Sequence, residues 1–208
     1  MQLDHVLIAV ADLAAAASEI EARHGLASIE GGSHPGWGTA NRIVPLGDSY
    51  LELVAAVDRA AAAQSAFGRW VAAVHPKLGQ PLGWAVRIDD LDPLARRLDL
   101  SIQAGSRATP SGQLLQWRSA GIEQAIAEPS LPFFIEWGQG TPHPGRVTVN
   151  HRVAPVEIAR LELAGDPDQL AHWLGNHQLP IAVRPGQPAV VTIVLTGAEG
   201  EIILDERL

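Results

Sequence analysis

Two glutamates stand inside apolar, strand-like stretches of the sequence and are the first candidates for chemistry. Glu136 lies in PFFIEW (132–137), and Glu52 lies in SYLELV (49–54). A charged carboxylate moved into an apolar core costs several kcal/mol, so it shifts its pKa, finds a partner or stays in water. The question is therefore what these two carboxylates face.

Strand alternation predicts which side chains share a face with each glutamate. Successive side chains of a strand point to opposite faces. In DHVLIAV, His5 therefore shares a face with Leu7, and in PFFIEW, Glu136 shares a face with Phe134. If both faces of the sheet are covered, His5, Glu52 and Glu136 are expected to gather in a cup lined by aromatic residues, with Phe134 contacting a substrate.

Ordinary roles for these residues stay open. A histidine on a strand is more often a hydrogen-bonded structural residue than a ligand. Either glutamate could face solvent, pair with an arginine such as Arg42 or Arg87, or persist as a neutral acid. A structural role is also expected for His143 and His151, whose spacing matches no metal site.

A glycine-rich stretch, GGSHPGWGTANR (31–42), is the second candidate site. Its glycines allow the backbone to approach a ligand closely. The substrate-binding candidates in it are a donor, an aromatic wall, two neutral hydrogen-bonding groups and a cation: His34, Trp37, Thr39, Asn41 and Arg42. Together they suit an oxygen-rich or anionic small molecule. Asn41 and Arg42 point to opposite faces of an ideal strand, and a turn of ordinary surface residues is the alternative.

Composition limits the classes of function. The 208 residues carry a net charge of −8 and a single lysine, which argues against a nucleic-acid surface. The absence of cysteine excludes disulfides, zinc–cysteine sites and thiol nucleophiles. No P-loop, dinucleotide-binding fingerprint or GxSxG motif is present, so no nucleotide cofactor is expected. No apolar run approaches ~20 residues and no basic leader precedes one, so we expect no membrane association and a cytoplasmic location.

The elements that must position these residues recur in the order β-α-β-β-β. The first copy predicts a strand at 3–10, a helix from the N-cap Asp12 to Gly25, and strands at 26–30, 39–46 and 49–57. The second predicts a strand at 82–88, a helix in DDLDPLARRLDL, and strands near 101–106, 113–119 and 132–137. The third predicts a strand at 157–165, a helix capped by Asp166, and strands near 179–184, 189–195 and 201–205.

The repeats divide the chain into units at 1–58, 82–137 and 157–208, with a connecting segment at 59–81 and a turn-rich connector at 138–156. The stretch 58–75 is expected to form one amphipathic helix. Such units rarely close a core alone, so we predict an α+β protein of curved mixed sheets in which the units pair.

The sequence resembles the vicinal oxygen chelate superfamily, which includes glyoxalase I, extradiol dioxygenases, epimerases and bleomycin-resistance proteins. The stretches that carry the resemblance are LDHVLIAVADL, HPGWGTANR, YLELVAAVD and LPFFIEW followed by HPG, and the last three point to its glyoxalase-like branch. The resemblance extends over nearly the whole chain. It implies the fold more specifically than the reaction, because one fold hosts many activities.

The resemblance also implies a set of metal ligands. In metal-dependent members two units pair into a cup, and each unit can supply a histidine from its first strand and a glutamate from its last. The matching residues here are His5, Glu52 and Glu136, with Gly83 where the fourth ligand would stand. One imidazole and two carboxylates would suit divalent Zn, Ni, Mn or Fe.

Two functions follow as hypotheses. The first is a metal-dependent enzyme of the lyase, isomerase or dioxygenase type that acts on a small oxygenated metabolite. Its metal would polarise the substrate as a Lewis acid, and Glu52 or Glu136 could act as the base. The alternative is a metal-free binding or resistance-type protein that sequesters a hydrophobic or aromatic ligand, which the replacement by Gly83 favours. A structural domain with a vestigial cup is a third hypothesis.

An odd number of units leaves the pairing open. If the first unit pairs with the second, Glu136 can join His5 and Glu52. If the first pairs with the third, Glu136 leaves the site. Alternatively, the unpaired unit mates with its copy in a homodimer.

Overall fold

A computed structural model describes residues 1–73, 79–109, 111–154 and 156–205. The first part of the chain forms β1 (Gln2–Ala9), α1 (Leu13–His24), β2 (Ile29–His34), β3 (Thr39–Pro45), β4 (Tyr50–Ala56), α2 (Arg59–Gln64) and α3 (Ala66–Ala72). The middle forms β5 (Gln80–Arg87), α4 (Leu91–Leu98), β6 (Gln103–Ala108), β7 (Leu114–Ala120), α5 (Ile122–Ala127) and β8 (Phe133–Trp137). The last part forms β9 (Glu157–Gly165), α6 (Pro167–Leu174), β10 (Ile181–Pro185), β11 (Ala189–Gly197) and β12 (Gly200–Leu204).

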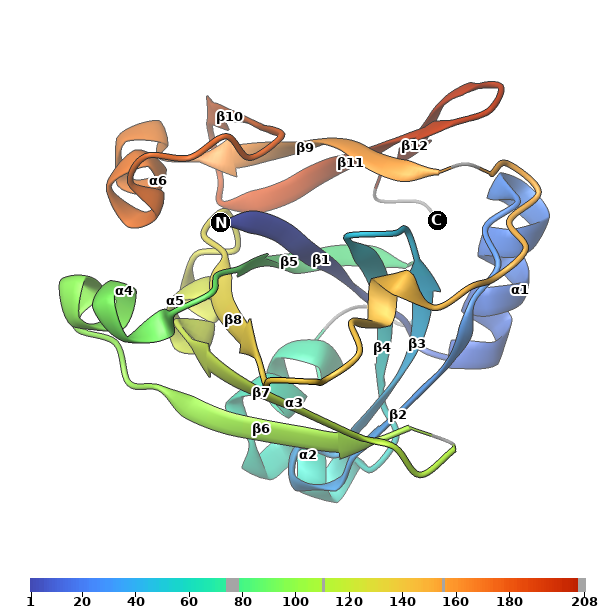
Figure 1. Cartoon of the computed structure of the whole chain (residues 1–208), viewed down its shortest axis with the longest axis horizontal. Coiled ribbons are helices and arrows are strands. Elements are labelled where there is room, and N and C mark those ends of the chain that lie inside the picture. Colours follow the sequence, from blue (N-terminus) through green and yellow to red (C-terminus); the bar gives the residue numbers. More distant parts are fainter. Residues whose placement is uncertain (74–78, 110, 155, 206–208) are drawn as a thin grey trace.

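These strands form two sheets, and the α+β class predicted from the sequence is confirmed. The larger sheet has eight strands in the order β2-β3-β4-β1-β5-β8-β7-β6. Its two halves join where β1 pairs antiparallel with β5. The smaller sheet has four strands in the order β10-β9-β11-β12. Figure 1 shows this smaller sheet, in orange and red, lying across the β1/β5 pair. The units at 1–58 and 82–137 therefore share one sheet.

The helix ends follow the signals in the sequence. The side chain of Asp12 accepts hydrogen bonds from the N–H groups of Ala14 and Ala15 at the start of α1. Gly25 ends that helix at φ 68°, in the left-handed region that favours glycine. Asp166 caps α6 in the same way, through the N–H groups of its second and third following residues. Both predicted N-caps are confirmed.

Two features of the connections differ from the prediction. The stretch expected to form one helix over 58–75 forms two, α2 and α3, because Ser65 between them is extended and caps α3 through the N–H of Gly68. The end of that stretch, 74–75, lies outside the described residues. The structure also contains α5, a helix of six residues that the sequence pattern did not predict; it begins after Gly121 and lies between β7 and β8.

The larger sheet has both faces covered. Its outer face packs on the smaller sheet, where Val6, Trp84 and Phe134 join a core that includes Leu161 and Ile193. Its inner face carries a second, smaller apolar cluster under α3 and α5. Among the described residues, no helix combines the length and the apolar character needed to cross a membrane.

Candidate functional site

The larger sheet curls until its two edge strands, β2 and β6, meet. Arg107 of β6 crosses this seam and donates a hydrogen bond to the carbonyl oxygen of Gly31 in β2. At the same seam the backbones come so close that a Cβ added to Gly32 would lie 2.7 Å from the carbonyl oxygen of Ala108. Glycine is therefore required here, and Figure 1 shows β2 and β6 side by side at the bottom of the cup.

A cavity of about 50 Å³ lies on the inner face, large enough for water or part of a small molecule. Strands of both halves of the sheet line it, together with α3 and α5. Its polar lining residues are His5, His34, Asn41, Tyr50, Glu52, Arg107 and Ser119. Its apolar lining residues are Leu7, Trp37, Phe67, Trp117, Ile122, Phe133, Ile135 and Trp137.

His5 and Glu52 face each other across neighbouring strands. The register of β1 with β4 places His5 beside Tyr50 and Leu7 beside Glu52. The imidazole of His5 stacks on the Tyr50 ring at 4.7 Å, and its Nε2 lies 3.6 Å from Oε2 of Glu52. The other carboxylate oxygen, Oε1, accepts a hydrogen bond of 2.7 Å from Nδ2 of Asn41. Glu52 is thus held in place by a neutral amide, with one oxygen left toward His5.

An irregularity in β1 orients the imidazole. The pairing of β1 with β5 shifts register between Leu3 and His5, which leaves Asp4 as the extra residue of a bulge. Asp4 and His5 therefore come together although they are consecutive in the chain, and Nδ1 of His5 lies 2.7 Å from Oδ2 of Asp4. This hydrogen bond fixes Nε2 as the ring nitrogen that faces Glu52.

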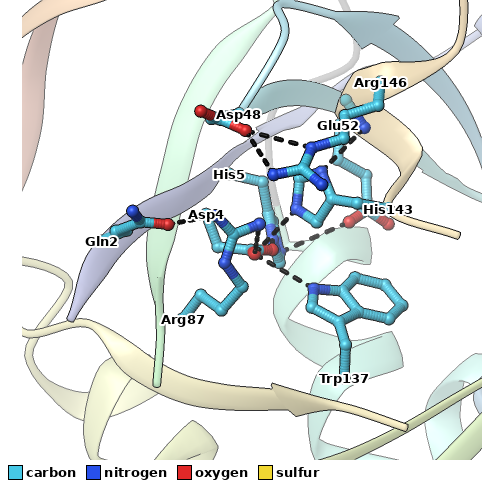
Figure 2. A network of polar contacts seen from close by, with 10 residues as sticks. Gln2, Asp4, His5, Asp48, Glu52, Arg87, Trp137, His143 and Arg146 are labelled. Atoms are coloured by element: carbon cyan, nitrogen blue, oxygen red, sulfur yellow. Dashed lines mark hydrogen bonds and ion pairs between the residues drawn. The ribbon is translucent and has the colours of Figure 1, made fainter. Parts of the chain in front are cut away.

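Asp4 is fully buried at the centre of the polar network in Figure 2. Its Oδ1 accepts hydrogen bonds of 3.0 Å from Nε1 of Trp137 and from Nε2 of His143. His143 donates through Nε2 because its Nδ1 accepts the N–H of Gly145. Burial alone would raise the pKa of Asp4, but the hydrogen bonds from His143 and His5 outweigh it, so the pKa of Asp4 lies well below its ordinary value.

Glu136 and Phe134 lie on the other face of the sheet, so the structure does not bring them to His5 and Glu52. Oε2 of Glu136 accepts hydrogen bonds of 2.7 Å from Arg118 and 2.8 Å from the N–H of Leu91, the first residue of α4. Phe134 is fully buried, and its ring lies 5.8 Å from that of Trp173 in α6. The expected alternation is observed, but the cavity lies on the face opposite these two residues.

The loop candidates divide between the cavity and its surroundings. His34, Trp37 and Asn41 line the cavity, whereas Thr39 lies buried behind His34, with its Oγ1 3.3 Å from Nδ1. Arg42 points away, as alternation predicts, and donates hydrogen bonds to Oγ and the carbonyl oxygen of Ser28. Burial lowers the pKa of His34. The Glu52 carboxylate opposes this shift, and the cation of Arg107 adds to it to a smaller extent.

Several residues of the site are not marked by any motif in the sequence. Arg107 is the only buried residue of a strand whose other side chains are partly or fully exposed, and no motif marks it. Asp4 carries no signal in the sequence beyond its place as a polar residue in an apolar run. Trp117 carried a weak signal, because a tryptophan opposite Gly105 in the next strand has room to lie over that glycine.

The joint between β1 and β5 shows which residues of the two halves correspond. His5 lies opposite Ala85, and Leu7 lies opposite Gly83. Counting back seven residues from the helix N-caps Asp12 and Asp90 gives His5 and Gly83, so these two residues correspond in the two halves. Ala85 then corresponds to Leu7. This is the correspondence that the resemblance implied for the first strands, with Gly83 at the position of His5.

The same relation places Phe133, and not Glu136, at the position of Glu52. Leu7 lies beside Glu52 in the β1/β4 pair, and Ala85 lies beside Phe133 in the β5/β8 pair. Glu136 is three residues further along β8. An offset by an odd number of residues moves a side chain to the opposite face. This explains why the two glutamates, which look alike in sequence, face different environments.

The residues of the cup do not fit the expected metal site. Gly83 supplies no side chain, and a Cβ added there would lie 2.5 Å from the ring of Trp70, which fills the space of the missing ligand. Within the described ranges, no group of three or more His, Cys, Asp or Glu side chains could hold a metal ion. His5 and Glu52 are the two predicted ligands that meet.

The chain resembles known proteins in sequence and in structure. The family model for a glyoxalase-like domain matches residues 3–178. A hypothetical protein from Staphylococcus aureus has a similar structure, with a TM-score of 0.74 at 12% identity over 96% of this chain and 92% of that one. A methylmalonyl-CoA epimerase from Mycobacterium tuberculosis covers 65% of this chain and 85% of its own at 22% identity, with a TM-score of 0.45. No curated protein matches. The chain belongs to the glyoxalase-like domain family of the vicinal oxygen chelate superfamily.

Proposed function

We propose that the chain is a glyoxalase-like enzyme of the isomerase type, which moves a proton on a small oxygenated metabolite with Glu52 as the base. The observation that carries the proposal is the position of this carboxylate. Its residue is 7% exposed and lines the cavity, and its Oε1 is fixed by Asn41. A positioned carboxylate that is sheltered from water is suited to abstract a proton from carbon.

The proton can be followed through the site. Oε2 of Glu52 would take a proton from a carbon next to a substrate carbonyl, and the C–H electron pair would move onto the carbonyl oxygen. Returning the proton to either face of that carbon, or to its neighbour, completes an epimerisation or an isomerisation. His5, with Nε2 at 3.6 Å, is placed to exchange the proton with Glu52, and Asp4 keeps its ring in that orientation.

Positive charge in the same cavity supports this chemistry. Arg107 lines the cavity and is 7% exposed. A cation held in a site with little water stabilises negative charge on a bound substrate. Glu136 takes no part, because it faces the other side of the sheet and is occupied by Arg118 and Leu91.

Hydrogen exchange tests the proposal directly. Small carbonyl compounds with an acidic C–H are incubated with the protein in D2O, and loss of the C–H signal is followed by proton NMR. General base catalysis contributes about 10²–10⁴-fold, so Glu52→Gln should slow the exchange by at least 10²-fold. The matched control, Glu136→Gln, should exchange within twofold of the wild type. Equal rates for wild type and Glu52→Gln would overturn the role of Glu52.

The metal hypothesis is tested on the same samples. Protein purified without chelator is assayed for transition metals, and the exchange is repeated with added Zn, Ni, Mn and Fe(II). Exchange that requires one of these ions and is lost in Glu136→Gln would favour the metal ligands predicted from the sequence, His5, Glu52 and Glu136, over a role of Glu52 as the base alone.

The second candidate function is a protein that binds a hydrophobic or aromatic compound without changing it. The apolar lining favours it, since Trp37, Trp117 and Trp137 and two phenylalanines surround the polar residues. Native mass spectrometry of freshly purified protein would show a co-purified organic ligand. Such a ligand, together with no hydrogen exchange on any carbonyl compound, would favour this function.

The remaining expectations concern the partner, the location and the oligomeric state of the protein. We propose a small molecule as the partner, in preference to nucleic acid or a membrane, and a cytoplasmic location. The homodimer stays a prediction, which light scattering coupled to size exclusion tests.

A further inference from the structure

Arg107 is a buried cation that the protein itself leaves largely unpaired. A guanidinium carries five N–H donors. The partner found for it among the described residues is the neutral carbonyl oxygen of Gly31. No ion pair of the described chain includes Arg107, whereas Arg118 pairs with Asp92 and Glu136.

Such an arrangement is unfavourable unless something else meets the charge. A buried charge without a counter-charge is strongly destabilising, and donors left without acceptors add to this cost. Burial is the main cause that lowers the pKa of His34 and raises the pKa of Tyr50; the cation of Arg107 adds to the first shift and opposes the second. Because Arg107 also lines the cavity, its remaining donors are available to a bound molecule.

The neighbourhood of Arg107 shows what the rest of that molecule would contact. Two positions before it on the same strand face, Gly105 has no side chain, and the indole of Trp117 lies over it. Trp117 contacts Trp137 edge to face, with ring centroids 5.8 Å apart. The cation therefore stands beside an aromatic wall, which suits an anionic group attached to an apolar or planar body.

We propose that Arg107 binds the carboxylate of the ligand, so that the cavity takes small monocarboxylic acids with an apolar or planar body. A guanidinium matches a carboxylate with two parallel hydrogen bonds, and the small cavity favours this compact anion. This inference deepens the proposed function, because it names the substrate class of the same cavity. The acid would also carry a carbonyl group. Its carboxylate would lie at Arg107, and the carbon next to that carbonyl would point toward Glu52.

The test compares acids with their neutral amides. Propionate and benzoate, each beside propionamide or benzamide, are titrated into the protein while the fluorescence of the cavity tryptophans is recorded. Wild-type protein should bind at least one acid tenfold or more tightly than its amide. The proposal is overturned if neither acid binds more tightly than its amide.

Variants then assign the preference to one residue. Arg107→Gln should abolish the difference between acid and amide, and Arg107→Lys should retain part of it. The matched control is Arg42→Gln, since Arg42 lies on the opposite face and bonds to Ser28, and it should behave as wild type. Circular dichroism shows whether each variant is folded. An acid preference that survives in folded Arg107→Gln overturns the assignment.

Failure of this inference can be distinguished from failure of the proposed function. Preference for acids without hydrogen exchange would leave Arg107 as the anion site of a binding protein and would overturn catalysis by Glu52. A different result would overturn only the substrate class. In that case hydrogen exchange depends on Glu52 but proceeds equally on neutral compounds and is unaffected by Arg107→Gln.

Discussion

Replacing Glu136 by glutamine separates a structural carboxylate from a functional one. Its Oε2 accepts charge-assisted hydrogen bonds of 2.7 Å from Arg118 and 2.8 Å from the N–H of Leu91. Because Leu91 is the first residue of α4, the negative charge also lies at the positive end of a helix. The substitution keeps the shape of the side chain and removes the charge.

The magnitude follows from the partial exposure of the pair. Hydrogen bonds to charged groups contribute about 1.5–3 kcal/mol when buried, and exposed ion pairs contribute about 0–1 kcal/mol. The side chain of Glu136 is 23% exposed and that of Arg118 is 38% exposed. We therefore expect Glu136→Gln to lower the free energy of unfolding by about 1–2 kcal/mol at pH 7.

The loss should depend on pH in a defined direction. The hydrogen bond from Arg118, followed by that from Leu91, lowers the pKa of Glu136 in the folded protein against the opposing effect of burial. Its stabilisation is therefore complete above the pKa of the unfolded chain, about 4.3, and is lost as the pH falls through the lower pKa of the folded state. The difference between wild type and variant should narrow below about pH 4.

Urea denaturation followed by circular dichroism at pH 7 and pH 3.5 measures this difference. Glu201→Gln, at an exposed position of β12, is the matched control and should change little. Wild-type stability of Glu136→Gln at pH 7 would contradict the structural role of this carboxylate, and a loss of ligand binding in addition would assign it to the site.

Three further substitutions test the packing around the site. Phe134→Ala should lower the free energy of unfolding by about 3–5 kcal/mol in guanidinium denaturation, because the fully buried ring joins the two sheets; a loss under about 1 kcal/mol would contradict its place in the core. Gly31→Ala should push aside Asn41, because the side-chain oxygen of Asn41 occupies the space of the added Cβ. Hydrogen exchange in the NMR assay should become slower while the protein stays folded, and unchanged exchange would show that the amide does not position the base. Gly83→His should clash with Trp70 and bind no Ni or Zn in calorimetry, and a stoichiometric site would refute the fit argument.

The sequence carried enough information for the elements and for which side chains share a face. Alternation in PFFIEW correctly separated Phe134 and Glu136 from Phe133, Ile135 and Trp137. It could not show which of the two faces lines the cavity, because both faces of this strand are covered by apolar groups. That choice depends on where the smaller sheet packs, and the packing brings together residues far apart in the chain.

The missed residues depend on contacts that no local pattern reports. Asp4 enters the network because the pairing of β1 with β5 shifts by one residue, and a register shift is a property of two strands. Arg107 is buried because its strand meets Gly31, which is separated from it by 76 residues. Without the contact between β2 and β6, Arg107 would be a surface cation on an exposed edge strand.

The arrangement of charge in the cavity argues for a ligand that spans it. Arg107 and Glu52 line the same cavity, yet no ion pair joins them, and each is held by a neutral group, the carbonyl oxygen of Gly31 and the amide of Asn41. Two opposite charges in a weakly polar space attract strongly, so a protein selected only for stability would pair them or replace both with apolar residues. Holding them apart preserves a cation and a base at separate points of one cavity. A carboxylic acid satisfies both if its carboxylate binds the cation and a C–H next to a carbonyl group reaches the base.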